Sequence, residues 1–122
     1  MISDSLFVLG QLATSSNSYT KMSLQGYPEN FVNVPNHHLL KVKSWGLASD
    51  NYAKALFNVS FGDEMTLADV FLCESLHIDV DWKLEIPKGP IYAELKSDGS
   101  TVIKGQFWLL GFLKPKRKEA KT

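Results

Sequence analysis

The chain lacks the features of a disulfide-bonded scaffold and of a membrane-spanning protein. Its 122 residues include one cysteine, Cys73, so no disulfide can form within the chain. No apolar run approaches the roughly 20 residues that a membrane-spanning helix needs. The first residues are acidic and the apolar run at residues 6–9 is short, so we expect no signal peptide. These absences favour a protein that folds and assembles in the reducing interior of a cell.

Motifs of catalysis and cofactor binding are also missing. The sequence has no glycine-rich phosphate-binding loop, no G-x-S-x-G nucleophile motif and no paired cysteines at zinc-binding spacing. Such motifs bring nucleophiles, bases or metal ligands together, and without them the sequence gives no basis for a reaction. We therefore expect a protein that is not an enzyme and that holds no cofactor.

The formal net charge is zero, but the charges are unevenly distributed. Residues 1–113 hold eight lysines against twelve aspartates and glutamates, a net charge of −4. Residues 114–122 hold five basic residues against one glutamate, a net charge of +4. A charge run of this kind is usually solvated and disordered. The alternative is a weak, non-specific contact with nucleic acid or with an acidic partner surface.

The composition is that of one folded domain, with 44% hydrophobic and 21% charged residues. The clearest pattern lies at residues 76–86, where apolar and polar residues alternate. Successive side chains of a β-strand point to opposite faces, so this pattern predicts a long strand with one face on a core and one facing water. The apolar face consists of Ile78, Val80, Trp82, Leu84 and Ile86.

Further alternating or apolar segments predict strands at residues 5–12, 19–24, 39–47, 53–61, 91–96 and 101–113. The turn at residues 48–51 predicts a hairpin between the two strands that flank it. A second hairpin is predicted at residues 97–99, where a left-handed Gly99 allows Leu95 to pair with Thr101 and Ala93 with Ile103. Residues 87–90 predict a tight turn. Residues 64–74 fit either a short helical turn or a buried strand.

The last predicted strand changes character along its length. It alternates as far as Gln106, and residues 107–113 are then apolar on both faces. An open edge of this kind would invite aggregation, so we expect the strand to be central or buried in an interface. We expect an interface with subunits or partners to include residues of this strand and of the weakly patterned segment 13–35, namely Phe107, Trp108, Leu110, Phe112, Tyr27 and Phe31.

These segments together predict an all-β fold, an antiparallel β-sandwich or jelly roll of about six to eight strands. We expect three regions. Residues 1–35 form an N-terminal strand and an extended arm, residues 36–113 form the sandwich core, and residues 114–122 form a basic tail.

Two sets of residues are candidates for binding chemistry. His77, Asp79 and Asp81 share one strand face at intervals of roughly 7 Å, so they could hold a metal ion, although a solvated strand face or a polar subunit interface has the same pattern. Trp45 and Trp108 could stack on sugar rings, and the alternative for both is packing in the core or in an interface.

The order of elements from residue 37 to residue 112 resembles that of small β-sandwich accessory proteins of tailed-phage virions, such as capsid decoration or cement proteins. The similar segments are HLLKVKSWGL, ASDN, AKALFNVSF, HIDVDWKLEI, PKGP and IYAELKSDGSTVIKGQFWLLGF. The resemblance implies a non-enzymatic virion protein that oligomerises, often as a trimer, and docks on other virion proteins such as the major capsid protein. A carbohydrate-binding sandwich module is the alternative.

Overall fold

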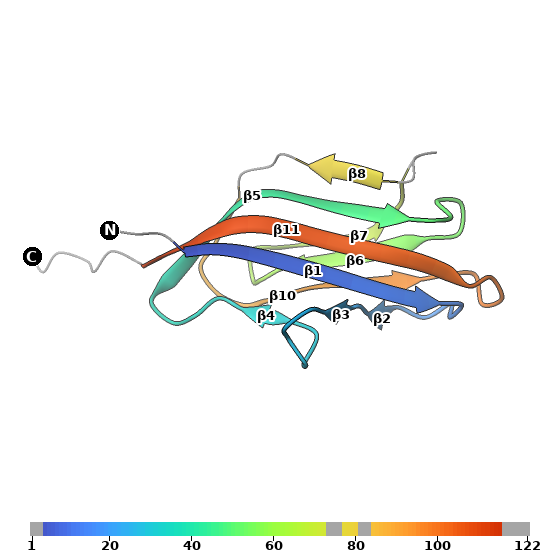
Figure 1. The fold of residues 1–122 in the computed structure, drawn as a ribbon, viewed down its shortest axis with the longest axis horizontal. Helices are drawn as coiled ribbons and strands as arrows, with labels where there is room; N and C mark the ends of the chain where they lie inside the picture. Colours follow the sequence, from blue (N-terminus) through green and yellow to red (C-terminus); the bar gives the residue numbers. More distant parts are fainter. Residues whose placement is uncertain (1–3, 73–76, 81–83, 116–122) are drawn as a thin grey trace, which may run out of the picture.

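A computed structural model describes residues 4–72, 77–80 and 84–115, and these residues form eleven strands in two antiparallel sheets (Figure 1). The strand order of the first sheet is β3-β1-β11-β5-β8, and β9 also pairs with β5. The order of the second sheet is β2-β10-β6-β7, and β4 also pairs with β10. The strands are β1 (Asp4–Thr14), β2 (Thr20–Lys21), β3 (Ser23–Leu24), β4 (Val32–Asn33), β5 (His38–Ser49), β6 (Leu56–Phe61), β7 (Met65–Val70), β8 (His77–Val80), β9 (Leu84–Ile86), β10 (Pro90–Lys96) and β11 (Ile103–Pro115).

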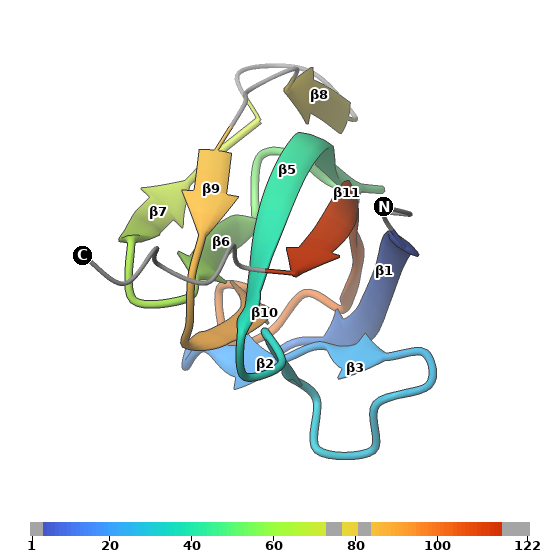
Figure 2. The ribbon, with the colours of Figure 1, turned by 90° about the vertical axis from the view of Figure 1, so that its left-hand side faces the viewer.

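The all-β sandwich is therefore confirmed, with more strands than the six to eight predicted. Figure 2 looks at the molecule end-on and shows β6 and β7 on one side and β11 and β1 on the other. The additional strands are short. Three of them, β2, β3 and β4, have two residues each and come from the weakly patterned segment 13–35.

β11 lies at the centre of the first sheet, between β1 and β5, as the apolar character of residues 107–113 predicts. It pairs with β1 over eleven consecutive positions, from Asp4 opposite Leu113 to Thr14 opposite Ile103. Its pairing with β5 contains a register shift between Leu110 and Gly111. At Gly111 a Cβ atom would lie 2.7 Å from the Lys41 carbonyl oxygen, so this position requires a glycine.

The core lies between the sheets and is built from alternate residues of the long strands. Each fully buried apolar side chain contributes roughly 1.5–3 kcal/mol to the stability of the fold. Trp45 of β5 lies against Phe61 of β6 in an edge-to-face arrangement, with ring centroids 5.2 Å apart, and so connects the two sheets. The largest fully buried side chains are Phe57, Phe61, Phe107, Met22, Leu40, Leu47, Leu72, Ile86, Ile91, Leu95, Ile103 and Leu109.

Both predicted hairpins are wrong. β5 and β6 lie in different sheets, and so do β10 and β11. Leu95 pairs with Phe57 and Thr20, and Ile103 pairs with Thr14, so the predicted pairs of Leu95 with Thr101 and of Ala93 with Ile103 do not form. Two strands that face the same core from opposite sheets show the same alternation as two strands of one hairpin. The pattern therefore gives the faces of a strand but not its neighbour. Gly99 does adopt the predicted positive φ, 96°.

The long strand predicted at residues 76–86 is present as β8 and β9, which both pair antiparallel with β5. The register differs by one residue between the two, since Val80 pairs with Trp45 and Leu84 with Val42. Residues 64–72 contain β7, so a strand is confirmed there and the helical turn is wrong. The strand is not a buried one, because none of its residues is buried and Phe71, which follows it, is exposed. Cys73 and Trp82 lie outside the described residues.

The segment expected to form a loose N-terminal arm belongs to the sandwich. β1 pairs with β11 from Ile103 to Leu113, and Met22, Leu24, Val32 and Val34 are part of the core. A few apolar side chains that point into the core are enough to hold a segment against a sheet, and so few residues produce only a weak alternating pattern in the sequence. The expected division at residues 35 and 36 therefore does not correspond to a break in packing. The basic residues 116–122 lie outside the described residues.

The predicted turn at residues 87–90 carries the chain from the first sheet to the second. Gly62 N–H donates to the Pro90 carbonyl at 2.9 Å, and Asp63 N–H donates to the Lys88 carbonyl at 2.9 Å. Gly62 and Gly89 both have positive φ, 64° and 104°, and a side chain on either would collide with the opposite backbone. These two glycines allow the β6–β7 turn and the β9–β10 crossing to be in direct contact.

Candidate functional site

The outer face of the first sheet carries several large apolar side chains that are not in the core. Of the residues expected at an interface, Trp108, Leu110 and Phe112 lie on this outer face of β11 and are partly or largely exposed. Phe107 does not, because it is fully buried on the opposite face. The expectation for Phe107 is therefore wrong. An apolar run on both faces of a strand still alternates in direction, and Phe107 points with Leu109 into the core.

β1 adds two residues to this surface that the sequence analysis missed. The register places Phe7 opposite Leu110 and Leu9 opposite Trp108. The exposed fraction is 56% for Phe7, 40% for Leu9 and 37% for Phe112. The sequence does indicate exposed apolar residues here, because residues 6–9, like residues 107–113, are apolar at both odd and even positions and so on both faces of the strand. We call this set of five residues the apolar strip: Phe7, Leu9, Trp108, Leu110 and Phe112.

β5 borders the strip with small residues and then with charge. Ser44 pairs with Leu110 and Gly46 with Trp108, so no large side chain of β5 covers the strip at these positions. Further along, Lys41 pairs with Phe112. The Lys41 ammonium lies 3.5 Å from a Glu85 carboxylate oxygen of β9, and both side chains are about half exposed. The strip therefore ends at a solvated ion pair, which contributes little to stability.

The opposite end of the strip adjoins a shallow hollow of about 330 Å³ between β3, β1 and β11. Gln11 pairs with Gln106 on one side and with Ser23 on the other, so these three residues form one row across three strands. Gln25 lies in the next row, where its N–H donates to the Leu9 carbonyl at 2.9 Å. The residues that line the hollow include none with a formal charge.

The edge of β1 next to the apolar strip is only partly paired. β3 pairs with β1 only at Gly10 and Gln11. Leu9 presents its carbonyl to this edge, and peptide groups of alternate residues face the same edge, so those of Phe7 and Ser5 also face it. On this edge no backbone hydrogen bond joins Ser5 or Phe7 to any residue that the structure describes. The edge can therefore accept another strand.

Tyr27 and Phe31, the other two residues expected at an interface, do not join the strip. Tyr27 packs against the core and donates its backbone N–H to the Leu24 carbonyl at 3.0 Å. Phe31 lies under the Lys21 ammonium, 5.3 Å from the ring centroid, and the same ammonium lies 4.6 Å from the Tyr92 ring. These aromatic side chains are engaged within the chain.

Side chains on the neighbouring face of the second sheet also contact one another. The Lys96 ammonium lies 4.7 Å from the Tyr19 ring centroid. The Tyr19 hydroxyl donates a hydrogen bond to Asp69. Burial together with this hydrogen bond raises the pKa of the Tyr19 phenol well above its usual range. The phenol therefore stays protonated, and its ring face is covered by a cation.

Trp45 is not available for stacking on a sugar. It is 3% exposed, lies between the sheets and contacts Phe61 edge-to-face. Its indole N–H has no hydrogen-bond partner among the residues that the structure describes. The core alternative is therefore the correct one for Trp45. Trp108, on the outer face, remains the candidate for sugar stacking.

The expected metal ligands are not brought together within the described part of the chain. His77 and Asp79 occupy β8, opposite Ala48 and Gly46 in the register. Asp81 lies outside the described residues. Within residues 4–72, 77–80 and 84–115, no three His, Cys, Asp or Glu residues are grouped so that they could hold a metal ion.

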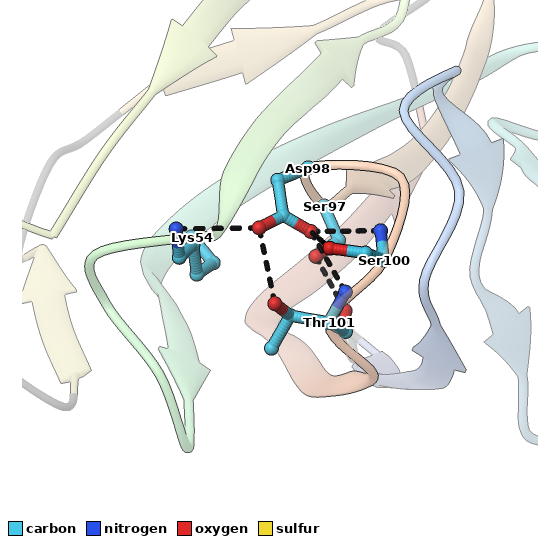
Figure 3. Close-up of polar contacts among 5 residues, drawn as sticks. All are labelled: Lys54, Ser97, Asp98, Ser100 and Thr101. Atoms are coloured by element: carbon cyan, nitrogen blue, oxygen red, sulfur yellow. Dashed lines mark hydrogen bonds and ion pairs between the residues drawn. The ribbon is translucent and has the colours of Figure 1, made fainter.

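A polar cluster fastens the crossing from β10 to β11 (Figure 3). The Asp98 carboxylate accepts hydrogen bonds from the N–H groups of Ser100 at 2.9 Å and Thr101 at 2.7 Å, and lies 3.2 Å from the Lys54 ammonium. The Ser97 hydroxyl donates to the Thr101 carbonyl at 2.6 Å. The two N–H groups hold the pKa of the Asp98 carboxyl well below its usual range. Because these groups satisfy one another, we interpret the cluster as structural.

The fold is thus that of a two-sheet antiparallel β-sandwich, and its most distinctive surface is an apolar strip that adjoins an uncharged hollow. The chain matches no model of a known protein family, and no curated protein matches it. Within the described residues there is no helix long and apolar enough to cross a membrane.

Proposed function

We propose that this protein is a non-enzymatic interaction protein that associates with copies of itself through the apolar strip. The observation that carries the proposal is the gathering of five large apolar side chains on the outer face of one sheet. The largest contiguous apolar patch on a soluble protein is often a site of interaction with a partner. Burial of this patch against another copy removes it from water.

The open edge of β1 supports a second copy as the partner. Phe7 contributes its side chain to the apolar strip and its peptide groups to this unpaired edge. A β1 strand from another copy can add antiparallel to the open part of the edge and bring its own Phe7 beside the first, while Gln25 occupies the edge at Leu9. Such a contact is self-complementary, and it extends both the sheet and the apolar surface.

The proposed role is that of an accessory protein of a phage virion, a capsid decoration or cement protein that docks on the major capsid protein. The support is the resemblance in the order of strands and turns between residues 37 and 112, together with the apolar strip. A decoration protein acts by burying surface between subunits, and the strip provides such surface. The resemblance implies three copies in the oligomer, whereas the antiparallel β1–β1 contact is two-fold and by itself gives a dimer. The mass of the oligomer in the sedimentation experiment below distinguishes the two.

Self-association is tested by sedimentation velocity on the full chain and on the variant Phe7→Ser. Phe7 is 56% exposed, which for a side chain of roughly 200 Å² is about 110 Å² of apolar surface. Burial of this area contributes about 2.8 kcal/mol per copy at about 25 cal/mol per Å². Even if only half of it is buried, Phe7→Ser raises the dissociation constant at least about tenfold.

Phe71→Ser is the matched control, because Phe71 has a similar exposed fraction, 61%, and lies outside the strip. We expect the unmodified chain and Phe71→Ser to sediment as the same oligomer, and Phe7→Ser to dissociate. An unmodified chain that remains monomeric at high concentration contradicts the proposal. The virion role is tested separately by co-sedimentation with assembled phage capsids, and an oligomer that binds no capsid contradicts that role alone.

A further inference from the structure

The hollow beside the apolar strip contains every glutamine of the chain. Gln11, Gln25 and Gln106 are the only glutamines among the 122 residues, and all three line this hollow. They come from three separate segments, and the pairing of β3, β1 and β11 brings them together. All three side chains are exposed. The nearest charged residue on this face is Lys104, which lines the adjoining hollow with Gln11, Ser23 and Gln106 but not this one.

The register defines the arrangement of these groups. Ser23, Gln11 and Gln106 form one row across the three strands, and Gln25, Leu9 and Trp108 form the next row. Neighbouring strands lie about 4.8 Å apart, and residues on one face are about 6.8 Å apart along a strand. The two rows therefore cover roughly 10 by 7 Å, an area that accommodates a sugar ring with its hydroxyl groups.

The chemistry of the hollow indicates the class of ligand. Each carboxamide presents donors and an acceptor, and the Ser23 hydroxyl can do both. Such groups match a ligand whose own hydroxyls donate and accept hydrogen bonds. No residue with a formal charge lines the hollow, so nothing there compensates a ligand charge. Trp108 is partly exposed and offers an apolar aromatic surface at the border.

We propose that this hollow binds a neutral saccharide, with the carboxamides of Gln11, Gln25 and Gln106 bonding the hydroxyls and Trp108 contacting the apolar C–H face of the ring. The volume of about 330 Å³ is at the lower end of the range of small-molecule sites, which suits one or two sugar units. The apolar end of the same face, with Phe7 and Phe112, does not line the hollow. Leu9 and Trp108 belong to both the strip and the hollow, so a contact between copies that covers Trp108 competes with the sugar. Phe7 does not line the hollow, so Phe7→Ser removes the contact between copies without removing a residue of the hollow.

The test is an NMR titration of the full chain with neutral sugars: glucose, galactose, mannose, N-acetylglucosamine and their disaccharides. The three glutamine side chains give the only glutamine NH₂ signals of the protein, so each reports directly on the hollow. We expect at least one of these sugars to shift the NH₂ signals and the Trp108 indole N–H signal in a saturable way. If none of these sugars produces a saturable shift, the proposal is overturned.

Variants then locate the site. We expect Gln106→Ala and Trp108→Ala each to weaken binding of the active sugar at least tenfold. Asn33→Ala is the matched control, since it removes an exposed carboxamide from β4, and we expect unchanged affinity. Unchanged affinity in Gln106→Ala overturns the proposal, as does tighter binding of glucuronic acid than of glucose. The Phe7→Ser variant separates the two proposals, because it loses self-association and retains sugar binding.

Discussion

Trp45 allows a quantitative test of the core, because its ring is fully packed and its one polar atom has no partner among the described residues. Trp45→Ala removes a large buried side chain and leaves a cavity, which costs about 3–5 kcal/mol. Trp45→Phe removes roughly 50 Å² of buried apolar surface, worth about 1 kcal/mol at about 25 cal/mol per Å². It also removes a buried, unpaired N–H group, whose desolvation costs the folded state about 1–3 kcal/mol.

The two terms for Trp45→Phe have opposite signs and together favour the variant by about 0–2 kcal/mol, so we expect its unfolding free energy to be no lower than that of the unmodified protein. The assay is equilibrium unfolding in urea, with the slope of the transition compared between variants to confirm a common two-state transition. The two variants should differ by at least about 3 kcal/mol. If Trp45→Phe is as unstable as Trp45→Ala, the indole N–H makes a hydrogen bond and the reasoning fails.

Three further predictions concern the turns and the polar clusters. Gly89→Ala lowers the unfolding free energy by about 1–3 kcal/mol, because Gly89 has a φ of 104° and a Cβ atom would collide with the Asp63 backbone. In the same urea assay Gly26→Ala should lower the unfolding free energy less, because a Cβ atom at Gly26 meets open space. Equal losses in the two variants refute the argument. The pKa of Asp98 is lowered on folding, so its carboxylate stabilises the protein at pH values above the ordinary pKa of 3.8, and this contribution is lost as the pH falls further. The difference in unfolding free energy between the unmodified protein and Asp98→Asn should therefore shrink between pH 5 and pH 2. A difference that stays constant over this range contradicts the prediction. The pKa of Tyr19 is raised on folding, so the protonated phenol stabilises the protein at pH values below its ordinary pKa of 10.0, and this stabilisation is lost at higher pH. Tyr19→Phe should therefore lose less stability in strong alkali than the unmodified protein, as measured by circular dichroism. An alkaline transition that is the same in both proteins contradicts the prediction.

The sequence pattern predicts strands and their faces well, because the two-residue period is a local property of the backbone. It predicted the central position of β11 from an apolar run that no exposed edge would tolerate. It did not predict which strands are neighbours. Leu95 and Ile103 both point into one core, and an alternating pattern is the same whether two such strands share a sheet or face each other across the sandwich. Pairing depends on the path of the whole chain, which no single turn specifies.

The same limit explains what the sequence analysis found and missed at the site. Trp108, Leu110 and Phe112 were found because they lie in a conspicuous run, whereas Phe7 and Leu9 lie in a short one and acquire significance only through their register with β11. Phe107 was assigned to the surface because an apolar run does not itself show which face is inward. The glutamines are more than 80 residues apart at their extremes, so no local motif could have joined them.

On the outer face of the first sheet, apolar residues of β1 and β11 give way to polar ones at the same height, although the two strands are far apart in the sequence. Along β11 the outward residues are polar as far as Gln106 and apolar after it, and along β1 the apolar Phe7 and Leu9 are followed by Gln11 and then by Ala13. The register places Gln11 opposite Gln106, so the two changes coincide although the strands run in opposite directions. The apolar strip and the hollow therefore meet at Leu9 and Trp108, and Lys104 lies on the same face beyond Gln106. Phe7→Ser and Gln106→Ala should accordingly have separable effects: the double variant should show the weakened self-association of Phe7→Ser and the weakened sugar binding of Gln106→Ala, each unchanged by the other substitution.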